Sequence, residues 1–346
     1  MSEKPYIGGQ AVLEGVMMRG PSCMSIAVRR PDGSIAVDEG PIESRVAEKM
    51  GKIPLLRALL MLVDSISLGM KALNFSAKHA FPEEESGTEG EGKLTIILSI
   101  FFAIGLFVAL PQGLTAGLGK LLGVELELTD VAFHALTGGF KLFVFLLYLV
   151  FVRRIPEMKR VFQYHGAEHK TIHAYEAGLE LTTDNVRAQS TLHPRCGTTF
   201  LVVVVIVSIL LGSIVTPLLL PNAEGLLGQA QVLALRIGLL PIIAGVSYEF
   251  QRFSARYCTT GPLRVLLLPG FAFQKITTIE PDDDQIEIAI AALAAAEWRE
   301  ESAASQEAVQ GTGQEMGQEM GQAIGQETLF FPNFEGFREA LPRLRG

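Results

Sequence analysis

The chain has 346 residues, of which 49% are hydrophobic and only 19% are charged. Soluble domains carry about 25% charged residues, so this composition excludes an ordinary soluble enzyme. The formal net charge of −8 excludes a general nucleic-acid binder, because contacts with phosphates need a surplus of cations. We therefore expect a membrane protein of mainly α class: a polytopic helix bundle with a small N-terminal β-hairpin and cytoplasmic helices.

The first segment with a structural signal is the predicted hairpin. Two runs of β type, residues 24–30 and 34–38, flank an Asp32-Gly33 pair, which is a strong turn signal. After it, apolar residues recur at helical spacing and predict an amphipathic helix over residues 54–80. This helix is expected to lie along the membrane or to pack under the bundle.

Residues 6–21, ahead of the hairpin, are dense in glycine and lack any phosphate-loop spacing. Paired glycines permit tight turns or a close approach of the backbone to another group. Glu14 and Arg19 are candidates for binding substrate or supporting a site that this segment closes. An ordinary turn followed by a strand is the alternative, and the sequence favours neither.

Four apolar segments predict membrane spans, which need about 20 mostly apolar residues each. They are residues 94–110, 131–152, 198–221 and 232–250. The fourth is the weakest, because Arg236 near its start must reach the interface with its long side chain. The short run 265–273 cannot cross and is expected to be interfacial.

The distribution of Lys and Arg predicts the orientation of these spans. Eleven precede residue 94 and seven lie between Arg153 and Gly197, whereas the connection 111–130 has only Lys120 and the connection 221–231 has none. Both termini and the middle loop are therefore expected on the cytoplasmic side of the cell membrane.

The middle loop carries the strongest chemical signal. His165, Glu168 and His169 have the spacing of an H-x-x-E-H metal motif. Residues four apart on a helix lie about 6 Å apart along its axis, so the two histidines can hold one ion from the same face. Glu168 beside them is the predicted catalytic group, a carboxylate that accepts a proton from water. The alternative is a chance match, because the motif is short.

The rest of the predicted metal site follows the loop. His193 and Cys196 precede the third span closely, both are suitable zinc ligands, and one of them is expected to complete the site. His173 and Glu176 form a second pair or orient the ligands from outside. Arg195 binds an anionic group of the substrate or anchors the loop at the membrane. The predicted cofactor is a divalent metal, with zinc preferred to iron and manganese.

Beyond the spans, Asp282–Glu300 predicts a helix with three Asp residues at its start and Ile286, Ile290 and Leu293 along one face. The tract after Glu301 is rich in Gln, Glu and Gly and is expected to be disordered. The segment 329–346 carries four phenylalanines, so a docking segment is the alternative there.

These predictions divide the chain into seven parts. They are a cytoplasmic N-terminal segment with the hairpin (1–50), the amphipathic helix (54–80), the first two spans (94–152), the cytoplasmic loop with the metal site (153–197), the third and fourth spans (198–250), a cytoplasmic C-terminal segment and helix (251–300) and the disordered tail (301–346).

Four blocks of the sequence together resemble the YqhQ-like family of bacterial membrane proteins. They are GGQAVLEGVMMRGP, YHGAEHKTIHAYEAG, LHPRCGTTF and PGFAFQKITTIEPDDDQIEIAIAAL. The resemblance covers residues 5–300 and implies a polytopic membrane protein described as metal-dependent, without a known reaction or substrate. It places the motif positions on His165, Glu168, His169, His193 and Cys196, whereas His173 is not a fixed feature of the family.

The leading hypothesis is a membrane-embedded, metal-dependent hydrolase that faces the cytoplasm and acts on a lipid-linked molecule or a peptide. The second is a non-enzymatic membrane binding or regulatory protein with a structural metal site. The third is a transporter that uses His134, Lys141 and Glu249, since ionisable groups within spans are costly and need a partner or a wet cavity. It ranks last because the spans show no internal repeat. A homo-oligomer is left open.

Overall fold

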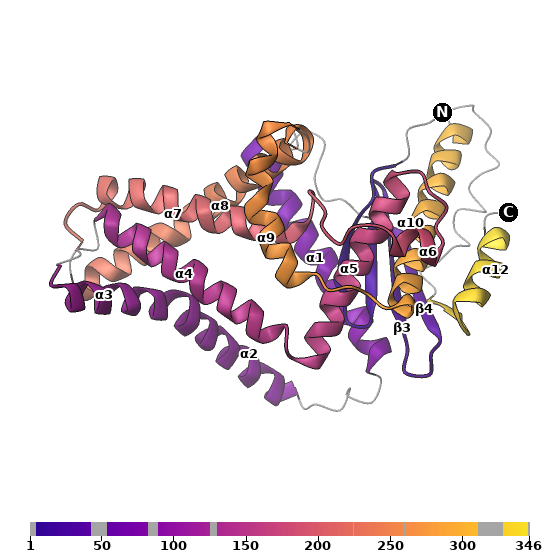
Figure 1. Ribbon diagram of the computed structural model, residues 1–346, viewed down its shortest axis with the longest axis horizontal. Coiled ribbons are helices and arrows are strands. Elements are labelled where there is room, and N and C mark those ends of the chain that lie inside the picture. Colours follow the sequence, from indigo (N-terminus) through magenta and orange to yellow (C-terminus); the bar gives the residue numbers. More distant parts are fainter. Residues whose placement is uncertain are drawn as a thin grey trace.

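The molecule is elongated, with a helical bundle at one end and a β-sheet covered by helices at the other (Figure 1). The computed structural model describes residues 5–42, 54–81, 89–124, 130–223, 225–258, 261–310 and 328–344. The metal motif lies on a helix at the junction of the two ends. Its position there depends on both the sheet and the bundle.

The sheet has five antiparallel strands in the order β1-β2-β3-β4-β5. The predicted hairpin is confirmed, with Asp32 accepting the Ser34 N–H at 3.0 Å and Gly33 at a φ of 84°. The glycine-dense segment ahead of it forms a second hairpin, whose turn holds Glu14 at a φ of 50°. The strands are β1 (Gly8–Val12), β2 (Gly15–Arg19), β3 (Cys23–Arg29), β4 (Ile35–Pro41) and β5 (Leu329–Phe331).

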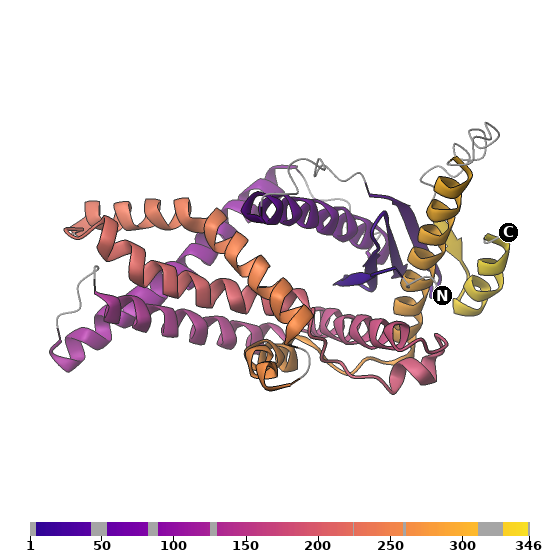
Figure 2. The ribbon, with the colours of Figure 1, turned by 90° about the horizontal axis from the view of Figure 1, so that it is seen from above.

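Both faces of the sheet are buried, which explains strands that are apolar almost throughout. Val16 and Met18 belong to a core shared with the helices α5 (Pro156–Glu176) and α10 (Asp283–Gln310). Met17 lies between them in sequence and belongs to a second core with α1 (Pro54–Ala80). Since successive strand residues point to opposite faces, the sheet separates two helical layers (Figure 2).

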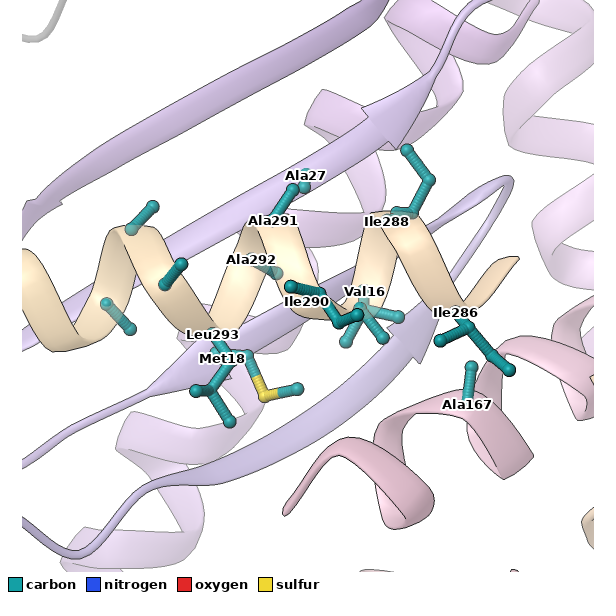
Figure 3. Close-up of a cluster of buried hydrophobic side chains, with 14 of the residues drawn as sticks. Val16, Met18, Ala27, Ala167, Ile286, Ile288, Ile290, Ala291, Ala292 and Leu293 are labelled. Atoms are coloured by element: carbon teal, nitrogen blue, oxygen red, sulfur yellow. The ribbon is translucent and has the colours of Figure 1, made fainter. Parts of the chain in front are cut away.

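Helix α10 supplies more of the larger core than any other element, and Figure 3 shows part of this contact. Ile286 and Leu293, which the sequence analysis placed on one face, are fully buried, and Ile290 is nearly so. The alanines between them are buried as well, and their small side chains let the helix lie close to the strands. Ser25 of β3 donates a hydrogen bond to the Ala292 carbonyl at this contact.

Within the described residues, four helical segments are long and apolar enough to cross a membrane. They are Ile97–Leu122, Val131–Val152, Gly197–Leu219 and Leu227–Ser254, and they match the four predicted spans. No more than 22% of the most apolar part of each segment is buried inside the protein. Apolar side chains such as Phe101, Leu210 and Leu218 point outward, as a lipid environment requires.

The first span is longer than the apolar run that predicted it. The chain passes without a break from α2 (Glu89–Ile104) through a π-helical turn (Gly105–Ala109) into α3 (Leu110–Leu122). Pro111 therefore does not end the span. A proline clashes with the preceding helical turn and lacks the N–H that would bond to it. The wider π turn just before Pro111 makes room for the ring, so the helix continues.

The remaining helices join the bundle to the sheet. Helix α4 (Val131–Val152) leads directly into α5, while α7 (Gly197–Leu219) and α8 (Gly225–Tyr257) form the third and fourth spans. The segment expected at the interface forms a 3₁₀ turn (Pro262–Leu267) and helix α9 (Leu268–Thr277), which packs against α7. A short helix, α6 (Thr183–Arg187), follows α5.

The prediction of a disordered tail over residues 301–346 is wrong at both ends of that range. Helix α10 continues to Gln310, β5 pairs with β4, and α12 (Phe334–Leu344) follows it. Phe337 packs edge-on against Phe331 and is buried, so these aromatic residues provide the apolar contacts of the C-terminal strand and helix. The repeats between residues 311 and 327 lie outside the described residues.

Candidate metal centre

Helix α5 presents the metal motif from a buried position. Pro156 opens the helix, where its missing N–H costs nothing, and Gly178, at a φ of 70°, follows its end. Gly166 lies so close to the Ile279 carbonyl that a Cβ would come within 2.1 Å of the oxygen. The motif is therefore part of a packed helix, which argues against a chance match in a surface loop.

Three predicted ligands converge on one point. The Nε2 atom of His165 lies 3.2 Å from the Sγ atom of Cys196, and the rings of His165 and His169 lie 4.4 Å apart. One donor atom from each of the three residues falls within 4.8 Å of the others. Two imidazoles and a thiolate are a ligand set that suits zinc and leaves a coordination position open.

Backbone carbonyls orient both imidazoles. The Nδ1 atom of His165 lies 2.8 Å from the Thr277 carbonyl of α9, and that of His169 contacts the Thr191 carbonyl. Each ring therefore donates from Nδ1 and directs the lone pair of Nε2 toward Cys196. Metal-binding histidines are commonly held by such a contact. The Nε2 atom of His169 is buried and has no hydrogen-bond partner among the described residues, so its lone pair is available to bind a metal ion.

Cys196 sits at the N-terminus of α7. Its sulfur accepts the Thr198 N–H at 3.4 Å and lies 3.1 Å from the Thr198 hydroxyl. Burial raises the pKa of the thiol, and the contacts with the first turn of α7 oppose that effect. The start of the third span thus holds a sulfur ligand directly against the histidines of α5.

Glu168 occupies the position beside the ligands that a proton carrier needs. One of its carboxylate oxygens lies 3.9 Å from the Nε2 atoms of both His165 and His169. Burial raises the pKa of Glu168 to about 8, opposed by the charge of His165. The Gly9 peptide N–H donates a hydrogen bond to the carboxylate, and a Cβ on Gly9 would come within 2.6 Å of the Glu168 Cγ atom.

His193 lies with a second group rather than with the first. Its Nε2 atom is 3.6 Å from the Glu176 carboxylate, and its ring is 4.6 Å from that of His173. Its Nδ1 atom accepts the Arg195 N–H at 3.3 Å, so the proton of the neutral ring resides on Nε2. Among the two ligands proposed to complete the motif, Cys196 is the one that reaches His165 and His169.

Of the other predicted site residues, Arg195 is near the centre and two residues are not. Arg195 forms an ion pair with Glu176 and lies over the Tyr6 ring, 4.4 Å from its centroid. Glu14 instead binds Arg160 through both carboxylate oxygens, outside the site. Arg19 lies 3.4 Å from the Ser65 hydroxyl.

A cavity of about 530 Å³ opens beside the three ligands. One wall is polar and includes His165, Glu168, His169 and Cys196. The opposite wall is apolar and comes from α4, α7 and α9, through Phe145, Leu149, Leu201 and Phe273. The candidate centre therefore faces a space lined partly by the ends of membrane-spanning helices.

Among the ionisable groups of the transporter hypothesis, His134 and Lys141 both lie near Arg236, whereas Glu249 has a different partner. Glu249 pairs with Arg57 of α1, and Arg236 lies 3.2 Å from the Nδ1 atom of His134. Arg236 therefore has a polar contact within the bundle instead of reaching the interface. These contacts give His134 and Glu249 separate structural partners.

Several residues that shape the centre could not be identified from the motif. Thr191 and Thr277 act through their backbone carbonyls, which every residue has, so the identity of the side chain does not reveal this role. Gly9 acts through its N–H and through the absence of a side chain. The Gly8-Gly9 pair was the only signal available for it, since paired glycines permit close backbone approach.

Comparison with known proteins extends the resemblance found in the sequence. The family "Protein of unknown function (DUF1385)" matches residues 53–298. The chain is also similar to "Uncharacterized protein YqhQ" of Bacillus subtilis (strain 168), with 36% identity over 298 residues that cover 83% of this chain and 90% of that protein. No solved structure matches the chain. The four sequence blocks thus identified the right family.

Proposed function

Since the chain belongs to the DUF1385 family, whose function is unknown, we propose an activity from the site itself: a membrane-embedded, metal-dependent hydrolase. His165, His169 and Cys196 would hold the ion, and Glu168 would carry the proton. The observation that carries this proposal is the convergence of three donor atoms within 4.8 Å beside a buried carboxylate and a cavity.

The residues of the chain divide the work of hydrolysis. A bound divalent ion supplies positive charge that polarises a substrate carbonyl or phosphoryl group and makes water more acidic. During cleavage of an ester, the water oxygen bonds to the carbonyl carbon and the bond to the alcohol oxygen breaks. Glu168 accepts one water proton at its carboxylate and passes it to the leaving oxygen, while the other stays on the new acid.

The properties of Glu168 suit this role. A proton carrier works best when its pKa lies near the working pH, and burial brings the pKa of Glu168 to about 8. The Gly9 N–H fixes the carboxylate, and apolar side chains line part of the cavity beside it. Zinc is the metal that the two imidazoles and the thiolate favour.

The proposed setting is the cytoplasmic face of a bacterial cell membrane, with both termini in the cytoplasm. The excess of Lys and Arg before residue 94 and in the loop 153–197 supports this orientation. A site at the end of the spans suits a substrate that resides in the bilayer, either a lipid-linked molecule or a peptide.

One observation favours the non-enzymatic alternative. The three ligands and their carbonyl partners come from α5, α7, α9 and the segment before α7, so an ion would tie the sheet layer to the bundle. Such an ion would act as a structural staple in a membrane binding or regulatory protein. The two functions differ in what Glu168 does.

Metal analysis combined with Glu168→Gln separates them. We expect one ion per purified wild-type chain, its loss in His169→Ala, and its retention in Glu168→Gln. An enzyme loses hydrolysis of ester, phosphoester or peptide test substrates in Glu168→Gln while its thermal stability is unchanged. Wild-type stability that collapses on chelation, with Glu168→Gln indistinguishable from wild type in every assay, would support the staple.

A further inference from the structure

A second cavity, of about 630 Å³, adjoins the metal centre. It shares Tyr6, Arg195 and Gly197 with the first cavity. Gln251 lies in its wall and donates a hydrogen bond to the Cys196 carbonyl at 2.9 Å, and the residues on either side of Cys196 belong to the same wall. A molecule in the second cavity therefore lies next to the segment that carries Cys196.

The described lining of this second cavity is cationic and rich in hydrogen-bond donors. Three arginines line it, Arg195, Arg252 and Arg256, and no described residue of the lining is a carboxylate. Arg195 has Glu176 as its partner, whereas the described ion pairs contain neither Arg252 nor Arg256. Two exposed guanidinium groups thus face a cavity that already offers the hydroxyls of Ser65 and Tyr248.

The second cavity lies at one end of the fourth apolar segment, where a helix that crossed a membrane would reach the lipid phosphates. The fourth span ends at Ser254, between Arg252 and Arg256, so these guanidinium groups lie where α8 leaves the apolar layer. Arginines at this level attract the anionic groups of lipids. The adjoining apolar wall of Phe145, Leu149 and Leu201 comes from the ends of α4 and α7, and it offers a surface for the first part of an acyl chain.

We propose that Arg252 and Arg256 bind the phosphate of a membrane lipid whose acyl chains lie toward α4 and α7, and that phosphate-bearing lipids are the substrate class of the centre. The planar guanidinium group pairs with two phosphate oxygens at once, which lysine cannot do. The assignment of a substrate rests on the proposed hydrolase, whereas the binding of the lipid does not.

The test is calorimetric titration of the full chain in detergent with three probes. Dioctanoyl phosphatidate carries both the phosphate and the acyl chains, dioctanoylglycerol has the chains alone, and inorganic phosphate has neither chains nor glycerol. Each probe is titrated into wild type, Arg252→Gln/Arg256→Gln and the control Arg264→Gln. Arg264 is an exposed arginine of the 3₁₀ turn and does not line the cavity.

We expect phosphatidate to bind wild type and Arg264→Gln equally and the double variant at least about tenfold more weakly, because two charge-assisted contacts are lost. Dioctanoylglycerol should bind all three proteins weakly and alike. Inorganic phosphate that binds as tightly as phosphatidate would overturn the lipid assignment in favour of a soluble phosphate. Phosphatidate affinity that is unchanged in the double variant would overturn the pocket itself.

His169→Ala, titrated in parallel, separates this inference from the proposed function. We expect it to lose the metal and keep its affinity for phosphatidate, since the arginines lie outside the ligand set. A wild type that binds phosphatidate through Arg252 and Arg256 but holds no metal would refute the hydrolase and leave a lipid-binding protein. Cleavage of phosphatidate by wild type, lost in both His169→Ala and the double variant, supports both proposals.

Discussion

Two groups of potential metal ligands lie along one helix, α5, and they differ in their surroundings. The first, His165, His169 and Cys196, is directed inward: carbonyl groups fix both rings and the donor atoms converge beside Glu168. The second, His173, Glu176 and His193, satisfies the same distance criterion but includes Glu176, which is exposed and already paired with Arg195.

The difference shows that spacing alone does not make a site. His173 follows His169 by four residues, just as His169 follows His165. Helical periodicity therefore places all three histidines on the same face of α5 and cannot tell which two bind an ion. What separates the two groups is the direction of the lone pairs and the presence of a competing cation. Arg195 repels a metal ion from the second group, whereas the first has no described cation so close.

The largest expected effect is on metal binding. His169→Ala should abolish stoichiometric zinc binding, because it removes one of three ligands from a buried centre. His173→Ala should retain the ion with an affinity within about tenfold of wild type, as for a change outside the ligands. Elemental analysis of both proteins measures this. Equal loss of metal in the two variants would contradict the distinction between the groups.

The two glutamates should differ in activity. Glu168→Gln should lower hydrolysis by about 10²–10⁴-fold, the usual contribution of a positioned proton carrier, with the metal retained. Glu176→Gln provides the matched control and should stay within about threefold of wild type, because it is paired with Arg195 outside the first group. Initial rates on one substrate decide the point, and comparable losses in both variants would refute the assigned role.

The approach of the backbone to Glu168 gives a smaller effect. Gly9→Ala places a Cβ within 2.6 Å of the Glu168 side chain and should cost about 1–3 kcal/mol of unfolding free energy, as overpacking does. Gly8→Ala is the control, since no atom lies within 4 Å of a Cβ there. Thermal unfolding compares the two. A Gly8→Ala variant that is as unstable as Gly9→Ala would show that neither effect comes from Glu168.

Glu39 is a buried carboxylate that lies outside both groups of potential metal ligands. It shows how burial alone changes the pKa of a carboxylate and the stability of the fold. Burial raises the pKa of Glu39 to about 7, and Arg299 at 3.8 Å only partly opposes it. Because the folded state binds the proton more tightly than the unfolded state, this group lowers stability as the pH rises from about 4.5 to 7.

Glu39→Gln should therefore raise the free energy of unfolding by about 1–2 kcal/mol at pH 8 and leave it unchanged at pH 4. Metal content and hydrolysis should match those of wild type at both pH values. Denaturant unfolding at the two pH values measures the difference. A gain of equal size at pH 4 would show that the effect does not arise from ionisation of Glu39.

The sequence predicted most of the bundle and two of the five strands of the sheet. Long apolar runs identify the four spans because twenty apolar residues have few other stable environments. The β3–β4 hairpin had a turn signal in Asp32-Gly33, whereas β1 and β2 were left open and β5 was missed. β5 has only three residues, and its partner β4 is nearly 300 positions away in the chain.

By itself, the sequence determined the family, the spans and the motif on α5, because hydrophobicity and helical spacing are local properties. Only the tertiary structure decided between Cys196 and His193 as partner of the motif, and only it placed Gly9 against Glu168. It also placed Arg252 and Arg256 in a cavity that shares Tyr6, Arg195 and Gly197 with the cavity of the centre. The reason is physical: these residues are separated from the motif by tens to more than a hundred positions, and only packing of the sheet against the bundle sets their distances.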